Sequence, residues 1–155
     1  MKDYAKKLMP DQDLDFGILP DLLCYALRKA QTSISENLNV PTYGLDISSG
    51  QLFLLVLLEA NPGQTAASLA RASQMDKSSL TPFLTRLEAQ GYVDRMQSRS
   101  DKRSLELYLT DSGRSLVTVL KARTIAYEAQ LSRRMGAEKF TQLRTLLAEA
   151  NLLLR

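Results

Sequence analysis

The chain has 155 residues, enough to bury a core without disulfides or metal, and a net charge of +3, too small by itself to indicate a nucleic-acid partner. It contains no histidine, which removes the usual zinc ligand and general base, and its one cysteine can form neither an internal disulfide nor a paired-cysteine site. Since no apolar run approaches the roughly 18 residues that span a bilayer, and no phosphate-loop or nucleophile motif is present, we expect a cytoplasmic protein that is not an enzyme, with no catalytic residue, metal or cofactor.

The N-terminal region is predicted to be a polar arm followed by one long helix. Residues 1–17 are rich in aspartate and show no periodicity, so we expect a loose arm. From Leu19 to Leu38 the apolar residues recur at helical spacing, which predicts an amphipathic helix of about five turns. Pro41 and Gly44 are expected to end it in a loop.

A second helix is predicted from Gln51 to Ala60, with Ser48 or Ser49 as its N-cap. Its segment 52–58 is apolar on nearly every face, which predicts a helix buried all round. The run Asn61-Pro62-Gly63 then forces a turn.

Two short helices follow, joined by a tight connection, and this arrangement is a helix-turn-helix. Thr65 is expected to cap residues 66–72, and Asp76 to cap the next helix, which ends at Gly91 in a left-handed conformation. A proline inside a helix costs about 3 kcal/mol. For this reason Pro82 predicts either a helix that starts late, near Ser79, or a helix that bends.

Beyond Gly91 the apolar period changes from 3.6 to 2, which predicts strands at 92–96 and 105–109 joined by a long polar loop. Thr110 is expected to cap a long helix that Gly136 ends, and a last helix is expected from about Ala137. The chain is therefore predicted to be mainly α, with a winged helix-turn-helix inside a largely helical fold.

The helix that Asp76 opens is predicted to be the recognition helix, because a helix of about 10–12 Å diameter fits the major groove of duplex DNA. Short polar side chains on its first turns are suited to bases and phosphates. The predicted DNA contacts are Lys77, Ser78, Ser79, Thr81, Pro82, Thr85 and Arg86.

The loop between the strands carries most of the local charge. Residues 77–103 hold six cations and three acids, so this segment has the whole net charge of +3. Arginines on a hairpin tip can enter the minor groove, and Asp101 is expected to orient the Arg103 guanidinium. The predicted wing contacts are Arg95, Arg99, Ser100, Asp101, Lys102 and Arg103.

These residues resemble the MarR/SlyA family of winged helix-turn-helix transcriptional regulators from Gly44 to Leu154. The resemblance is carried by Asn61-Pro62-Gly63-Gln64-Thr65, by Met75-Asp76-Lys77-Ser78-Ser79-Leu80-Thr81, and by Leu87-Glu88-Ala89-Gln90-Gly91-Tyr92-Val93-Asp94-Arg95. The most specific part is Asp101-Lys102-Arg103-Ser104 followed by Leu107-Tyr108-Leu109-Thr110-Asp111-Ser112-Gly113.

The resemblance implies a homodimer that reads a pseudo-palindromic duplex, usually as a repressor released by a signal. Residues 18–44 and 112–155 would then form the helical dimerisation region, and residues 45–111 the DNA-binding domain. The apolar stripes of the terminal helices agree with pairing of this kind.

The sequence leaves two kinds of signal open. Arg28 and Phe53 can supply a charge and a ring to an aromatic or phenolic acid or its thioester, although a surface arginine and a core phenylalanine are the more common roles. Cys24 either packs or senses peroxide, because the organic-hydroperoxide-sensing OhrR branch of the family carries its reactive cysteine in this helix. The tyrosines that bond the thiol in that branch are replaced here by Leu38 and Ser49, so ligand sensing ranks first.

A winged helix that only contacts other proteins is a further alternative. A protein-binding winged helix has no need of three cations around a hairpin tip, and the basic tip therefore favours DNA.

Overall fold

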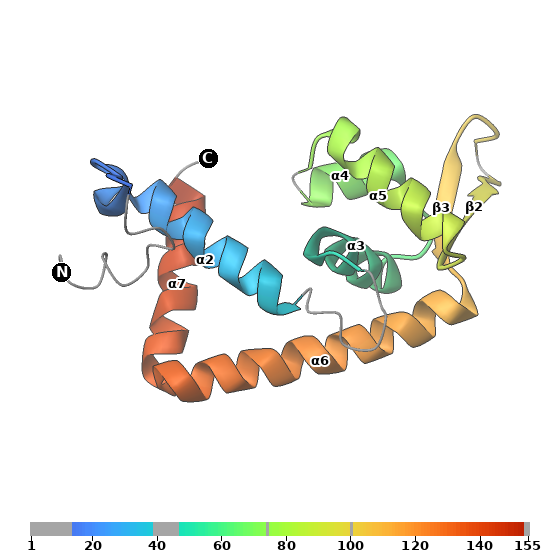
Figure 1. Cartoon of the computed structure of the whole chain (residues 1–155). Helices are drawn as coiled ribbons and strands as arrows, with labels where there is room; N and C mark the ends of the chain where they lie inside the picture. Colours follow the sequence, from blue (N-terminus) through green and yellow to red (C-terminus); the bar gives the residue numbers. More distant parts are fainter. Residues whose placement is uncertain (1–13, 39–46, 74, 100, 154–155) are drawn as a thin grey trace. The chain divides into compact units, whose positions relative to one another are not determined.

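The computed structural model describes residues 14–38, 47–73, 75–99 and 101–153 (Figure 1). The expectations for residues 1–13, Pro41, Gly44 and Ser100 lie outside these ranges, and the side chains of Leu38, Ser49 and Lys77 are not described. The chain divides into two compact units, residues 1–46 and residues 47–155.

The first unit contains a 3-10 turn, η1 (Leu19–Asp21), and the helix α2 (Leu23–Leu38). The α-helix begins four residues later than the predicted start at Leu19, because Pro20 lies in η1 and Leu22 is extended between the two elements. The apolar side chains of Leu23, Leu27 and Ile34 are exposed in this unit. The predicted amphipathic stripe is present, and its apolar side is uncovered.

The second unit begins with α3 (Ser49–Ala60), whose N-cap is Ser48. The hydroxyl of Ser48 accepts a hydrogen bond from the backbone N–H of Gln51, and the Gln51 side chain accepts one from the backbone N–H of Ser48. This reciprocal pair is a capping box. The prediction that α3 is buried all round is wrong, because the side chain of Phe53 is 62% exposed while the leucines at 52, 54, 55 and 58 are buried.

The helix-turn-helix consists of α4 (Ala66–Ser73) and α5 (Lys77–Ala89), capped by Thr65 and Asp76 as predicted. The late start for α5 is wrong, since the helix begins at Lys77 and Pro82 lies inside it. Pro82 has no N–H to donate to the carbonyl of Ser78. Both residues are exposed, so water can bond that carbonyl instead.

The wing is formed by β2 (Val93–Gln97) and β3 (Leu105–Leu109), which pair antiparallel with Val93 opposite Leu109. A third strand that the sequence did not predict, β1 (Gln64–Thr65), pairs with the other edge of β3, giving the order β1-β3-β2. The core of this lobe is aliphatic. Its most buried side chains include Leu55, Leu58, Leu69, Leu80, Leu84, Leu87, Leu107 and Val117.

Two long helices complete the second unit, α6 (Asp111–Met135) and α7 (Ala137–Leu153). Thr110 caps α6 through the backbone N–H of Gly113, and Gly136 has a φ of 88°, a left-handed value that favours glycine and separates the helices as predicted. In the described part of the chain, α7 has no buried residue and no helix is long and apolar enough to cross a membrane.

Candidate nucleic-acid interface

The first turn of α5 is organised by the carboxylate of Asp76. Its Oδ1 accepts hydrogen bonds from the hydroxyl of Ser78, at 2.5 Å, and from the backbone N–H of Ser79, at 2.7 Å. Its Oδ2 accepts one from the hydroxyl of Ser79, at 3.0 Å. The hydroxyl of Ser78, followed by the two groups of Ser79, lowers the pKa of Asp76 from 3.8 to about 2, so the carboxylate is ionised at neutral pH.

The outer face of α5 carries the residues that the sequence predicted for DNA contact. Leu80, Leu84 and Leu87 are buried in the lobe and fix the rotation of the helix. The predicted contact residues with described side chains are all exposed, namely Ser78, Ser79, Thr81, Pro82, Thr85 and Arg86. One continuous polar face of α5 is therefore open to a ligand.

The tip of the wing is closed by hydrogen bonds within the hairpin. The backbone N–H of Ser98 donates to the carbonyl of Ser104 at 3.0 Å, and the side-chain amide of Gln97 donates to the carbonyl of Lys102 at 2.6 Å. The side chains of Arg99, Lys102 and Arg103 are exposed around this closed tip. The wing thus holds three cations on an internally bonded loop.

Asp101 acts on the backbone of the tip. Its carboxylate accepts a hydrogen bond from the backbone N–H of Arg103 at 2.9 Å, and its carbonyl accepts one from the N–H of Ser104. The predicted ion pair of Asp101 with the Arg103 guanidinium is absent from the described residues. A short acidic side chain before a turn commonly bonds the N–H two residues on, and Asp101 follows this pattern.

Arg95 joins the wing to the recognition helix. Its Nε lies 2.6 Å from Oε1 of Glu88, on the last turn of α5, and about a third of each side chain is exposed. The sequence predicted Arg95 as a DNA contact and did not predict a role for Glu88. Glu88 lies on a helix and Arg95 on a strand, so neither the helical nor the strand period relates the two positions. The sequence therefore could not indicate this pair.

A second polar cluster lies on β3, next to the tip of the wing. The hydroxyl of Tyr108 donates to Oε2 of Glu106 at 2.8 Å. The hydroxyl of Ser98, followed by that of Tyr108, lowers the pKa of Glu106, and the accepting carboxylate in turn raises the pKa of Tyr108. The carboxylate of Glu106 is therefore held charged behind the cationic tip, a feature that the sequence did not indicate.

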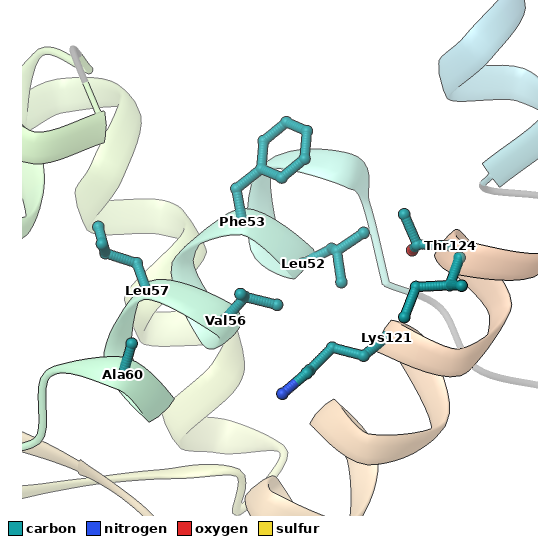
Figure 2. A pocket seen from close by; sticks show the side chains of 8 residues that line it. Leu52, Phe53, Val56, Leu57, Ala60, Lys121 and Thr124 are labelled. Carbon is teal, nitrogen blue, oxygen red and sulfur yellow. The ribbon is translucent and has the colours of Figure 1, made fainter. Parts of the chain in front are cut away.

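An apolar pocket of about 440 Å³ lies between α3 and α6 (Figure 2). Its lining residues are Leu52, Phe53, Val56, Leu57, Ala60, Lys121, Thr124 and Ile125. One cation stands in the lining, the ammonium of Lys121, whose Nζ lies 2.8 Å from Oε2 of Glu59. Phe53 was predicted as a possible effector contact and is one of the residues that line this pocket.

The remaining predicted effector residues lie in the first unit. Cys24 and Arg28 are both exposed on α2. The sequence missed Lys121 and Ile125. The sequence did contain one indication of the pocket. The segment 52–58 of α3 is apolar on nearly every face, and a single lobe cannot cover all of these faces.

Similarity to known proteins decides the family. The profile of the MarR family matches residues 47–105. The HTH-type transcriptional regulator SarZ of Staphylococcus haemolyticus (strain JCSC1435) is 30% identical over 104 residues, which cover 67% of this chain and 71% of SarZ. The chain belongs to the MarR family. It is therefore a DNA-binding transcriptional regulator and not an enzyme, as the sequence predicted.

Other relatives agree with the predicted fold and with the weaker likeness to peroxide sensors. The organic hydroperoxide resistance transcriptional regulator of Bacillus subtilis (strain 168) is 28% identical over 103 residues, 66% of this chain and 70% of the relative. The transcriptional repressor CouR bound to a 23-mer DNA duplex has a TM-score of 0.80 and 31% identity, over 90% of this chain and 99% of CouR. CouR bound to p-coumaroyl-CoA has a TM-score of 0.78 and 28% identity, over 90% and 98%.

Proposed function

We propose that this MarR-family protein is a homodimeric repressor that binds a pseudo-palindromic duplex and leaves it when an aromatic acid or its thioester binds. The observation that best supports this proposal is that one lobe presents both the polar face of α5 and the cationic wing tip. The ion pair of Glu88 and Arg95 joins the two. A helix inserted in the major groove and a basic hairpin in the neighbouring minor groove together grip duplex DNA.

Exposed leucines support the dimer. Leu143, Leu146 and Leu147 are 40%, 55% and 42% exposed on α7, and this helix has no buried residue in the described chain. An apolar face of this length needs a cover in water. A second copy supplies one, because the same face on each chain can pair across a two-fold axis.

The pocket between α3 and α6 supports a small-molecule signal. Its volume of about 440 Å³ is within the range of small-ligand sites and its lining is apolar. An acidic group at its edge would take the place of Glu59 as the partner of Lys121. CouR, which resembles this chain, binds p-coumaroyl-CoA, a phenolic thioester. Aromatic acids and their thioesters have the ring and the negative charge that such a lining accepts.

Redox sensing is the second candidate, favoured by the exposed thiol of Cys24. A 28% identical relative is named as an organic hydroperoxide resistance regulator. One assay can distinguish redox sensing from ligand sensing, because a peroxide must oxidise the Cys24 thiol whereas an aromatic acid leaves it unchanged.

The test is release of a duplex selected from a random pool. We expect p-coumarate or p-coumaroyl-CoA to release the wild type, and Ile125→Trp, which fills the pocket, to weaken this release about tenfold or more. The matched control is Val119→Trp, an exposed position on α6 outside the pocket, which should respond as the wild type. Release by cumene hydroperoxide that Cys24→Ser abolishes, with no response to aromatic acids, would replace the ligand assignment by the redox one.

A further inference from the structure

The serine hydroxyls on the first turn of α5 already donate hydrogen bonds within the protein. Ser78 and Ser79 each donate their single hydroxyl proton to the carboxylate of Asp76, at 2.5 Å and 3.0 Å. The backbone N–H of Ser79 also donates to this carboxylate, at 2.7 Å. All three residues are exposed, so the cluster lies on the surface that faces a ligand of α5.

A serine hydroxyl has one donor and two lone pairs, and an ionised carboxylate only accepts. With both protons directed to Asp76, the hydroxyls of Ser78 and Ser79 have only lone pairs left for an outside partner. Bonds to an ionised acceptor are roughly twice as strong as neutral ones. A neutral base edge therefore cannot compete well with Asp76 for these protons.

Because both hydroxyl protons are directed to Asp76, the first turn of α5 is a poor site for a phosphate. Phosphate oxygens only accept hydrogen bonds, and the negative charge of Asp76 already occupies the helix N-terminus, where a phosphate would otherwise bind. Phosphate contacts must then come from cations elsewhere, such as Arg99, Lys102 and Arg103 on the wing. The first turn of α5 is left to the bases.

We propose that Ser78 and Ser79 act as acceptors only, so that the first turn of α5 selects a base with an amino group in the major groove. Cytosine N4 and adenine N6 carry such groups, whereas guanine and thymine present only acceptors and a methyl group there. Cytosine fits best, since its own major-groove edge has no acceptor to oppose the lone pairs. The inference rests on the proposed function, because it requires α5 to lie in the major groove.

The test removes single amino groups from the selected duplex. At each position of one half-site, cytosine is replaced by 2-pyrimidinone, or adenine by purine, and the dissociation constant is measured. Loss of one contacted amino group should weaken binding by the wild type about five- to tenfold at one or two positions. In the double variant Ser78→Ala/Ser79→Ala the same replacements should have no further effect there.

Ser115→Ala is the matched control. Ser115 is an exposed serine near the start of α6 and is not among the predicted DNA contacts, so this variant should keep the full response to amino-group removal. Thermal unfolding of the double variant checks that α5 is intact, because Asp76 still accepts from the N–H of residue 79.

Three results would overturn the inference. The first is an equal response of the wild type and the double variant to amino-group removal, and the second is a selected half-site with guanine or thymine at every position that these variants affect. The third is an equal loss of affinity in the double variant for every duplex, whatever the bases of the half-site, which would mean that the serines bind phosphate. Failure to recover any duplex would instead contradict the proposed function itself, and this inference with it.

Discussion

At the scale of single residues, Asp76 has two roles that depend on its charge. It caps α5 by accepting from the N–H of Ser79, and its negative charge lies at the positive end of the helix dipole. Both effects favour the ionised carboxylate in the folded protein, and the hydroxyl of Ser78, followed by the backbone N–H and hydroxyl of Ser79, lowers its pKa to about 2.

The stability of the protein should therefore depend on Asp76 in acid. Since folding lowers this pKa from 3.8 to about 2, the ionised carboxylate stabilises the folded state fully above about pH 4, and this contribution is lost as the pH falls through about 2. In Asp76→Asn, which keeps a capping oxygen, the contribution is absent. Urea unfolding should show a gap between wild type and variant that closes between pH 4 and pH 2, and a gap that stays constant would contradict the assignment.

At Gly113 a nearby backbone carbonyl leaves no room for a side chain. A Cβ at this position would lie 2.1 Å from the carbonyl oxygen of Tyr92, which accepts from the N–H of Thr110. Gly113→Ala should therefore destabilise the fold by about 1–3 kcal/mol or more, as overpacking does. Gly50→Ala is the control, because the atoms nearest to its Cβ would be those of the Phe83 ring, a side chain that can move. Equal midpoints of thermal unfolding for the two variants would contradict this account.

Single residues also mark the limit of prediction from sequence. Asp76 and Thr65 were predictable as caps, because a capping side chain acts on the N–H groups two or three positions ahead of it. Phe53 was not predictable as exposed, because that depends on which faces of α3 the other helices cover. Asp101 was placed in the correct turn, but its partner is the N–H of Arg103 and not the guanidinium.

At the scale of elements, the wing and the recognition helix meet through Glu88 and Arg95. An ion pair this exposed adds only about 0–1 kcal/mol to stability. Its larger effect is on orientation, since Arg95 lies on β2 and Glu88 on α5. The structure thus gives Arg95 a positioning contact, and its direct contact with DNA stays a prediction.

A double-mutant cycle separates the two roles of Arg95. If it positions the wing, Glu88→Gln and Arg95→Gln should each weaken operator binding about two- to fivefold, and the double variant should be no weaker than either. The salt dependence of binding should stay unchanged in all three. If Arg95 binds phosphate, Arg95→Gln alone should weaken binding and reduce the salt dependence by about one charge.

The elements themselves differ in how well the sequence predicts them. The long helices and the two wing strands have clear apolar periods, and their observed bounds agree with prediction to within about two residues, apart from the starts of α2 and α5. The strand β1 has only two residues, Gln64 and Thr65, and exists because it pairs with β3. A segment of that length has no period to detect, so long-range pairing alone reveals it.

At the scale of the whole molecule, the proposed repressor places two lobes on one duplex. Two-fold symmetry would place the recognition helices about 34–36 Å apart, one turn of DNA, with each wing over a neighbouring minor groove. The leucines on α7 predict that the terminal helices make the pairing surface.

Methylation interference on the selected duplex shows whether each lobe grips two grooves at once. Methylation of guanine N7 blocks the major groove, and methylation of adenine N3 blocks the minor groove. We expect two blocks of major-groove interference one helical turn apart, each with minor-groove interference beside it, and Arg103→Ala should remove only the minor-groove signal. Interference confined to one groove, or an Arg103→Ala pattern identical to that of the wild type, would mean that the lobe does not grip both grooves.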